Sequence, residues 1–212
     1  MSGRRAYSDS DRQRVRQAFI DAGRRILVER GAGAMSMRQI AAESGYSAAS
    51  IYQYFHDQRA LIVAIRELDM NAATDAMEAC ARCIEDPPMR LREVMLTAAR
   101  YWLAHPDHFD VLFSGANAGS LLYTAEGTPF GQSPSVRRSM ALYTRVVDDY
   151  FRSLPRPPAE LALAVHTLIA AVHGAIAFPR LTPSMKWPET APMVEAVIDA
   201  LVRDWRRLGS TD

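Results

Sequence analysis

The 212-residue sequence has only two cysteines and no run of eighteen or more consecutive apolar residues. The missing apolar run argues against a membrane-spanning helix, and the polar first eleven residues lack the apolar centre of a signal peptide. We therefore expect a reducing, cytoplasmic location and no disulfides. Because 49% of the residues are hydrophobic, a sizeable core can form without disulfides or metals.

Motifs typical of enzymes are also missing: no Ser/His/Asp order, no glycine-rich phosphate loop and no paired carboxylates in a usable setting. Cys80 and Cys83 have the spacing of a redox motif, but they fall late in a predicted helix, the wrong end for stabilising a thiolate. His166 and His173 share one helix face, whereas zinc would need three or four suitably spaced ligands. We expect no enzyme, no metal and no cofactor.

Charge is unevenly distributed along the chain. Residues 1–60 carry ten arginines and six acidic residues, or +4, and the remaining residues carry fifteen basic and eighteen acidic side chains, or −3. A basic N-terminal segment suits a negatively charged partner such as DNA. Chance clustering of solvated arginines would give the same count, so charge by itself leaves both interpretations open.

Apolar residues recur with helical spacing, and no alternating pattern long enough for a sheet is found. The sequence therefore predicts an all-α fold of about nine helices. Capping residues, glycines and prolines delimit them at approximately 10–30, 37–43, 48–55, 58–83, 90–104, 107–113, 135–153, 160–178 and 193–208. Residues 114–133 are expected to form a long loop, and the segment from His105 to His108 is interpreted as a helix boundary.

The densest local pattern runs from Ser36 to Phe55, where a glycine separates two short helices. Such helices cross closely, which requires a small residue inside and a left-handed residue at the corner, here Ala41 and Gly45. Ile40 and Ile51 would form the shared core. Small residues at the amino end of the second helix would let its backbone approach base edges in a major groove. A helical hairpin inside any bundle would show similar small residues, but outward-facing tyrosines and a glutamine favour DNA binding.

This stretch resembles the TetR family of transcription regulators. The family pattern is Ile-Ala-x-x-x-Gly-x-Ser, a short variable stretch and Tyr-x-x-Phe, and it matches at Ile40-Ala41, Gly45, Ser47 and Tyr52 to Phe55. The rest of the chain matches only in helical layout, apart from Ala171 to Gly174, which resembles a motif in the ligand domain of one subgroup. The resemblance implies an N-terminal three-helix DNA-binding domain containing the helix-turn-helix over residues 1–57. A helical bundle for effector binding and dimerisation would follow over residues 58–212.

The resemblance also implies roles for individual residues. The side chains expected at phosphates are Ser36, Ser47, Tyr52 and Tyr54. Those expected at base edges are Arg38, Ala48, Ala49, Ser50 and Gln53. One position departs from the family, because Gln58 stands where a lysine usually contacts a phosphate, and Arg59 would replace that contact or leave it weaker. A homodimer on a palindromic operator is expected, since one helix-turn-helix reads too few base pairs.

The remaining helices would supply the dimer interface and an effector pocket. The interface is expected on the last two helices, at Leu161, Val165, Leu168, Ile169, Val172, Ile198, Leu201 and Trp205. The pocket, for a largely apolar small molecule, would be lined by Met77, Trp102, Phe109, Phe113, Met140, Tyr143, Val147 and, as a polar contact, His173. Ordinary core packing would explain both sets as well.

The sequence thus predicts a DNA-binding transcription regulator, most simply a repressor that a small-molecule effector releases. The alternative is a helical ligand-binding or redox-sensing module that has lost DNA binding.

Overall fold

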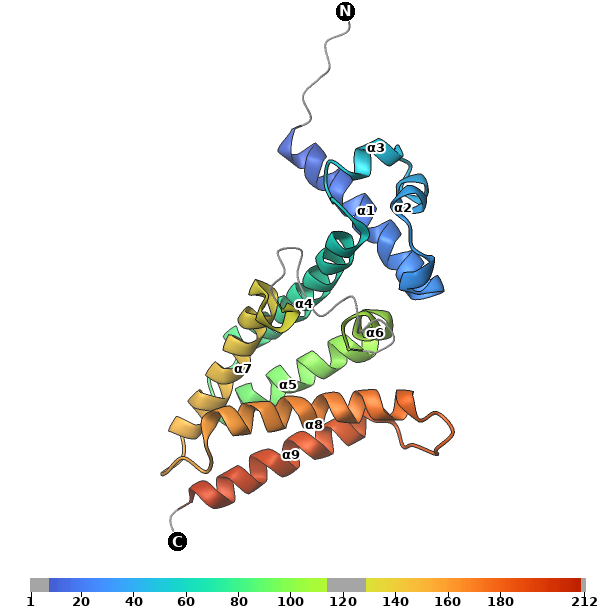
Figure 1. Cartoon of the computed structure of the whole chain (residues 1–212). Helices are drawn as coiled ribbons and strands as arrows, with labels where there is room; N and C mark the ends of the chain where they lie inside the picture. The colour runs from blue at the N-terminus through green and yellow to red at the C-terminus, as the bar shows by residue number, and fades with distance from the viewer. Residues whose placement is uncertain (1–7, 114–128, 211–212) are drawn as a thin grey trace, which may run out of the picture. The chain divides into compact units, whose positions relative to one another are not determined.

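The computed structural model describes residues 8–113 and 129–210. Within these ranges the chain forms nine α-helices and two short 3-10 turns, which confirms the predicted all-α fold (Figure 1). The helices are α1 (Asp9–Arg30), α2 (Met37–Glu43), α3 (Ala48–Ile51), α4 (Gln58–Arg82), α5 (Pro87–Ala104), α6 (Pro106–Phe113), α7 (Pro134–Arg152), α8 (Leu161–Leu181) and α9 (Thr190–Gly209). The 3-10 turns are η1 (Ala32–Ala34) and η3 (Phe130–Gln132). Most of the expected loop, residues 114–128, lies outside the described residues.

Several helices begin where a side chain accepts an otherwise free backbone amide. Ser36 and Ser47 cap α2 and α3 in this way, as predicted. Helix α5 starts earlier than expected because Asp86 caps it and prolines occupy its first turn, where a missing N–H costs nothing.

Helix α8 ends later than expected. The predicted stop at Phe178 is wrong by three residues, because the helix continues through Pro179 to Leu181. Proline disrupts a helix mainly through the preceding turn, and here only two helical residues follow it. The hydroxyl and the N–H of Thr182 then both donate to the carbonyl of Phe178, at 2.7 and 3.1 Å, and end the helix.

The described residues form two compact units, each treated by itself below. We define the head as residues 9–55. The first unit contains the head together with the part of α4 up to Asp69, α6 after Pro106, and η3. The second unit contains the rest of α4 together with α5, α7, α8 and α9. The unit that includes the head therefore extends beyond residue 57 and takes in α6 from much later in the sequence.

One apolar core joins α1, α2, α3 and the start of α4 in the first unit. Phe19, Ile40, Ile51 and Leu61 are all completely buried there. Helices α1 and α4 pack closely at Gly23, where an added Cβ would lie 2.8 Å from Cδ2 of Leu61. The head is thus anchored on α4 by direct helix packing.

In the second unit, α8 and α9 lie side by side (Figure 1). An ion pair and a hydrogen bond join α9 to α5 and α7. Arg92 on α5 pairs with Asp199 at 2.7 Å. The hydroxyl of Tyr150 on α7 donates to the carbonyl of Val202 at 2.9 Å. The rings of Phe151 and Trp205 meet edge to face at 5.4 Å.

Helix α8 is unusually apolar. By length and mean hydropathy, 1.9, it could cross a membrane, and only 33% of its most apolar window is buried within the chain. No uninterrupted apolar run reveals this helix, because His166, Thr167 and His173 interrupt the run without lowering its mean hydropathy much. Such a helix is also typical of a soluble protein whose outer face meets another surface.

Candidate nucleic-acid interface

Helices α2 and α3 form the compact hairpin that the sequence predicts. Gly45 adopts a φ of 80°, the left-handed conformation that the corner requires. The N–H of Tyr46 then donates back to the carbonyl of Ala41 at 2.9 Å. Because Ala41, Ile40 and Ile51 are completely buried, the two helices cross on small and branched side chains as expected.

The opposite face of α3 points to solvent. Ala48, Ala49 and Gln53 are exposed, and 57% of the Tyr52 surface is accessible. Arg38, on α2, is also exposed. A short helix that presents small residues at its amino end, flanked by a tyrosine, a glutamine and an arginine, has the shape and chemistry for a major groove.

Helix α3 is shorter than predicted, because it ends at Ile51 and the chain continues as a turn. The turn brings Phe55 into the core, where its N–H donates to the carbonyl of Ile51 at 2.9 Å. Tyr54 is half-buried, with its ring 5.6 Å from the Phe19 ring. Tyr54 and Tyr52 were both predicted at phosphates, but their environments differ. The Tyr54 ring packs against the core, and the Tyr52 ring faces outward.

The hydroxyls expected at phosphates also shape the hairpin. Ser36 Oγ accepts the N–H of Gln39, and Ser47 Oγ accepts the N–H of Ser50, each at 3.2 Å. Ser47 and Ser50 further share a hydroxyl contact of 2.8 Å. A serine hydroxyl that accepts an amide keeps its own O–H to donate, so capping and phosphate binding are compatible at Ser36.

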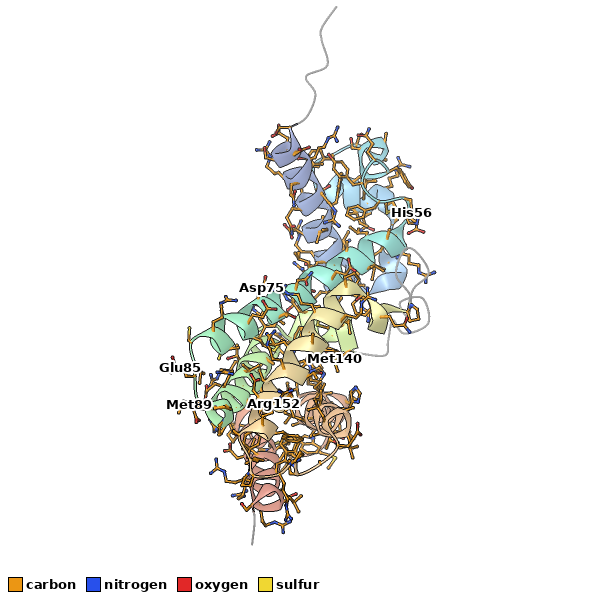
Figure 2. The ribbon with its side chains drawn as sticks, turned by 90° about the vertical axis from the view of Figure 1, so that its left-hand side faces the viewer. His56, Asp75, Glu85, Met89, Met140 and Arg152 are labelled. Atoms are coloured by element: carbon orange, nitrogen blue, oxygen red, sulfur yellow. The ribbon has the colours of Figure 1, made fainter. Side chains whose placement is uncertain are left out.

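His56, two residues before α4 begins, is a further exposed residue of this surface, and the sequence pattern did not single it out. Its side chain is 66% exposed and its Nε2 lies 3.2 Å from a carboxylate oxygen of Asp57. Figure 2 labels this histidine near the amino end of α4. Next to it, Gln58 is half-buried and Arg59 is exposed. Arg59 is therefore exposed enough to replace the phosphate contact that a lysine at position 58 would make.

The residues expected to line an effector pocket are mostly buried. In the second unit, Met77, Trp102, Tyr143 and Val147 are at most 6% exposed, and Met140 is half-buried. Burial raises the pKa of Tyr143 to about 12, against the opposing effect of a hydrogen bond with Ser139. Burial likewise lowers the pKa of His173 to about 4, so this histidine is neutral at physiological pH.

The other two residues of that set belong to the first unit. Phe109 is 3% exposed, Phe113 is 39% exposed, and their ring centres lie 4.8 Å apart.

A cleft of about 400 Å³ is present in the second unit, at different residues. Its described lining is Glu78, Ala81, Arg82, Arg90, Arg145, Val146 and Asp149. This lining is largely charged and includes none of the expected pocket residues, so the cleft does not correspond to the apolar pocket that the sequence predicts.

The residues expected at the dimer interface are largely core residues of the single chain. Val165, Leu168, Val172, Ile198 and Trp205 are at most 5% exposed, and Leu161, Ile169 and Leu201 are half-buried. Helical spacing had left ordinary core packing open as the alternative, and the buried members follow it. The buried members of the predicted set therefore pack within the single chain, on the inward faces of α8 and α9.

The cysteine and histidine pairs gain no support for redox or metal chemistry. Cys80 and Cys83 are free thiols at the carboxyl end of α4, whereas a redox pair of this spacing is expected at a helix amino terminus. Among the residues that the structure describes, no three His, Cys, Asp or Glu side chains form a group that could hold a metal ion.

Family comparisons agree with this geometry. The model of the bacterial regulatory proteins of the tetR family matches residues 19–65, and that of the tetracyclin repressor-like C-terminal domain matches residues 91–204. The chain belongs to the TetR family. It is therefore a DNA-binding regulator of transcription with a helix-turn-helix in its head. No curated protein matches the TetR-family chain in sequence.

Solved structures share the fold of this TetR-family chain at low identity. A protein of unknown function from Rhodococcus sp. RHA1 is 19% identical, with a TM-score of 0.72 over 97% of this chain and 100% of its own. SmeT, the repressor of the Stenotrophomonas maltophilia multidrug efflux pump SmeDEF, is 18% identical, with a TM-score of 0.68 over 89% and 88%. FadR from Bacillus subtilis in complex with stearoyl-CoA is 13% identical, with a TM-score of 0.69 over 88% and 97%.

Proposed function

We propose that this TetR-family protein is a cytoplasmic, sequence-specific repressor that a small-molecule effector releases from a palindromic operator. The observation that carries the proposal is the outward surface of α3 and the turn after it, where small side chains are followed by Tyr52 and Gln53 on a packed hairpin. Gln53 and Arg38 suit adenine and guanine edges respectively, and the alanines suit thymine methyl groups.

The roles of the individual head residues follow from their exposure. Arg38, Ala48, Ala49, Ser50 and Gln53 are proposed at base edges. Ser36, Ser47 and Tyr52 are proposed at phosphates, and Tyr54, being half-buried, contributes at most its hydroxyl. His56 and Arg59 would add backbone contacts at the start of α4.

We further propose a homodimer formed by the outer faces of α8 and α9. On α8 a stripe of uncharged, exposed residues runs through Leu163, Thr167, Ala170, Gly174, Phe178 and Leu181. On α9 the exposed residues Pro192, Ala196 and Ala200 recur at helical spacing. Two copies of this surface would form a four-helix bundle of small and apolar side chains, which supports it as the interface in place of the buried residues.

The effector is proposed to be largely apolar. Two relatives in fold support this class, since one represses a multidrug efflux pump and the other holds stearoyl-CoA. The soft buried residues Met77, Trp102 and Val147 would supply an apolar lining, with Tyr143 as a polar contact. An effector shifts the protein towards the non-binding conformation only by its higher affinity for that conformation.

Binding-site selection from random duplexes tests the DNA-binding proposal, and we expect a palindrome. Binding to the selected duplex should weaken steeply as salt rises, because phosphate contacts release counterions. Replacing Tyr52 and Gln53 with alanine together should weaken binding by about 2 kcal/mol or more, since a bidentate base contact alone contributes about 1–3 kcal/mol.

Met89→Ala is the matched control. Met89, at the start of α5, is 56% exposed, almost equal to Tyr52, and projects from the end of the bundle beside Glu85 (Figure 2). This variant should bind the duplex like the parent. If the double variant also keeps parental affinity for every duplex, α3 is not the reading element.

Stearoyl-CoA is a direct probe of effector control, measured by thermal shift and by gel shift with the selected duplex. We expect it or a hydrophobic drug from a panel to raise the melting temperature and release the duplex. A compound that stabilises the protein at saturation yet leaves duplex binding unchanged contradicts the release mechanism.

A further inference from the structure

A buried carboxylate lies where three helices of the first unit meet. Asp69 on α4 is 1% exposed, and its Oδ1 receives the guanidinium of Arg24 from α1 in an ion pair. Nδ1 of His108 on α6 lies 3.5 Å from the same oxygen. One carboxylate oxygen therefore joins the first helix of the head to α6.

Arg24 and His108 each have a second carboxylate on their own helix. A guanidinium nitrogen of Arg24 lies 3.8 Å from Asp21, one turn earlier on α1. Nε2 of His108 lies 3.8 Å from the carboxylate of Asp107 on α6. Arg24 and His108 can therefore bind Asp69 and cross-link the helices, or bind their neighbours and leave the helices unlinked.

The charged state of Asp69 is costly. Its Oδ2 and the Nε of Arg24 are buried without a hydrogen-bond partner in the described part of the chain. Burial raises the pKa of Asp69 to about 6, Arg24 opposes this, and Asp107 adds to it. A small acidification thus neutralises a group that most proteins keep ionised.

A second contact to α6 does not depend on Asp69. A guanidinium nitrogen of Arg66, one turn earlier on α4, donates to the carbonyl of Leu112 at 3.0 Å, and the guanidinium lies 3.9 Å above the ring of Phe130. Because α6 stays packed on α4, Asp69 stays buried when Arg24 leaves it, and without that guanidinium, which lowers its pKa, the carboxyl binds its proton more tightly. Loss of the Asp69 charge therefore favours the state in which α1 is no longer tied to α6.

We propose that Asp69 is a proton-responsive latch: ionised, it ties α1 of the head to α6 through Arg24 and His108, and neutral, it releases both to Asp21 and Asp107. Release lets α1 and α6 move independently, so the head must be ordered again when it binds DNA, and operator affinity falls. Only the fall in operator affinity rests on the proposed DNA-binding function; the release of α1 and α6 does not.

Operator affinity across pH tests the latch. Fluorescence anisotropy is measured from pH 7.5 to 5.5 at constant ionic strength in a His56→Gln parent, because an exposed histidine beside the DNA surface would titrate in the same range. We expect affinity to fall about five-fold or more, the usual lower limit for coupling between sites. Asp69→Asn should bind weakly at both pH values with a flat profile, and His108→Gln should keep part of the pH dependence, because Arg24 still pairs with ionised Asp69.

Asp75→Asn is the matched control. Asp75 lies further along α4 (Figure 2). Its side chain is 65% exposed and pairs with Arg138 on α7. This variant should keep the pH profile of the parent.

A second measurement needs no DNA and separates the latch from the proposed function. Hydrogen-exchange protection factors of α6 amides should fall several-fold in the free parent between pH 7.5 and 5.5, and should stay low in Asp69→Asn. If no duplex is bound at all, the proposed function fails while this measurement still decides whether the latch opens.

A parent whose α6 protection is unchanged by pH overturns the latch. Falling protection with constant operator affinity overturns its link to the head. If Asp69→Asn does not fold, the profile of His108→Gln decides the matter, because a flat profile there assigns the pH dependence to His108 and overturns the latch.

Discussion

Ala170 lies at the middle of the exposed stripe on α8, and replacing it with arginine tests the dimer surface. In the single chain Ala170 is exposed, so the substitution costs the helix only about 0.2 kcal/mol in intrinsic propensity. In the dimer, two cations would be buried against a helix that contains no acidic residue.

An unpaired buried charge costs several kcal/mol, and a long arginine side chain recovers part of this by reaching towards solvent. We expect the two buried arginines together to weaken dimerisation by about 3 kcal/mol, which raises the dissociation constant of the dimer roughly a hundred-fold. Separate subunits would also lose the advantage of two linked heads, so operator affinity should fall by about a hundred-fold or more.

Sedimentation velocity measures the first effect, and fluorescence anisotropy with the selected operator at nanomolar protein measures the second. Ala79→Arg, at an exposed position on α4 with Asp75 one turn before it, is the control and should remain dimeric. If Ala170→Arg sediments as a dimer at every concentration and binds the operator like the parent, the outer face of α8 is not the interface.

Three further outcomes are expected. Gly45→Ala should lower the free energy of unfolding by about 1–2 kcal/mol in urea, because Gly45 has a φ of 80°, whereas Gly33→Ala, in open space, should have little effect. Ile51→Ala should cost about 2–5 kcal/mol by leaving a cavity in a completely buried site, and faster amide exchange in α2 and α3 would report it. The pKa of Asp69 is about 6 in the folded chain and 3.8 as its ordinary value, so the folded state binds this proton more tightly. Its contribution to stability therefore rises as pH falls, by about 2 kcal/mol between pH 7 and pH 4.5 relative to Asp69→Asn, and parallel stability curves for the two proteins would contradict this.

The head was predictable because its signals are local. Ser36 and Ser47 cap helices within three residues, and Gly45 supplies a backbone conformation that its own chemistry permits. The misplaced end of α3 has a tertiary cause, since Phe55 enters a core built by α1 and α4. Tyr54 is half-buried for the same reason, because Phe19 lies 35 residues earlier in the sequence.

The sequence pattern of α8 does not predict which face of the helix is buried. A helix with apolar residues on nearly every side has no polar face to distinguish inside from outside. Leu168 and Val172 were therefore as good candidates for an interface as Ala170 and Gly174, and only packing against α7 and α9 determined which pair is buried.

By itself the sequence determined the helical fold class, the helix-turn-helix and the uneven charge, because these follow from capping, backbone conformation and composition over short stretches. Tertiary structure decided which faces are buried and which distant charges meet. Asp69 and His108 are 39 residues apart and belong to different helices, and neither position has a local signal of the other. Their meeting depends on the packing of α1, α4 and α6, which no local pattern encodes.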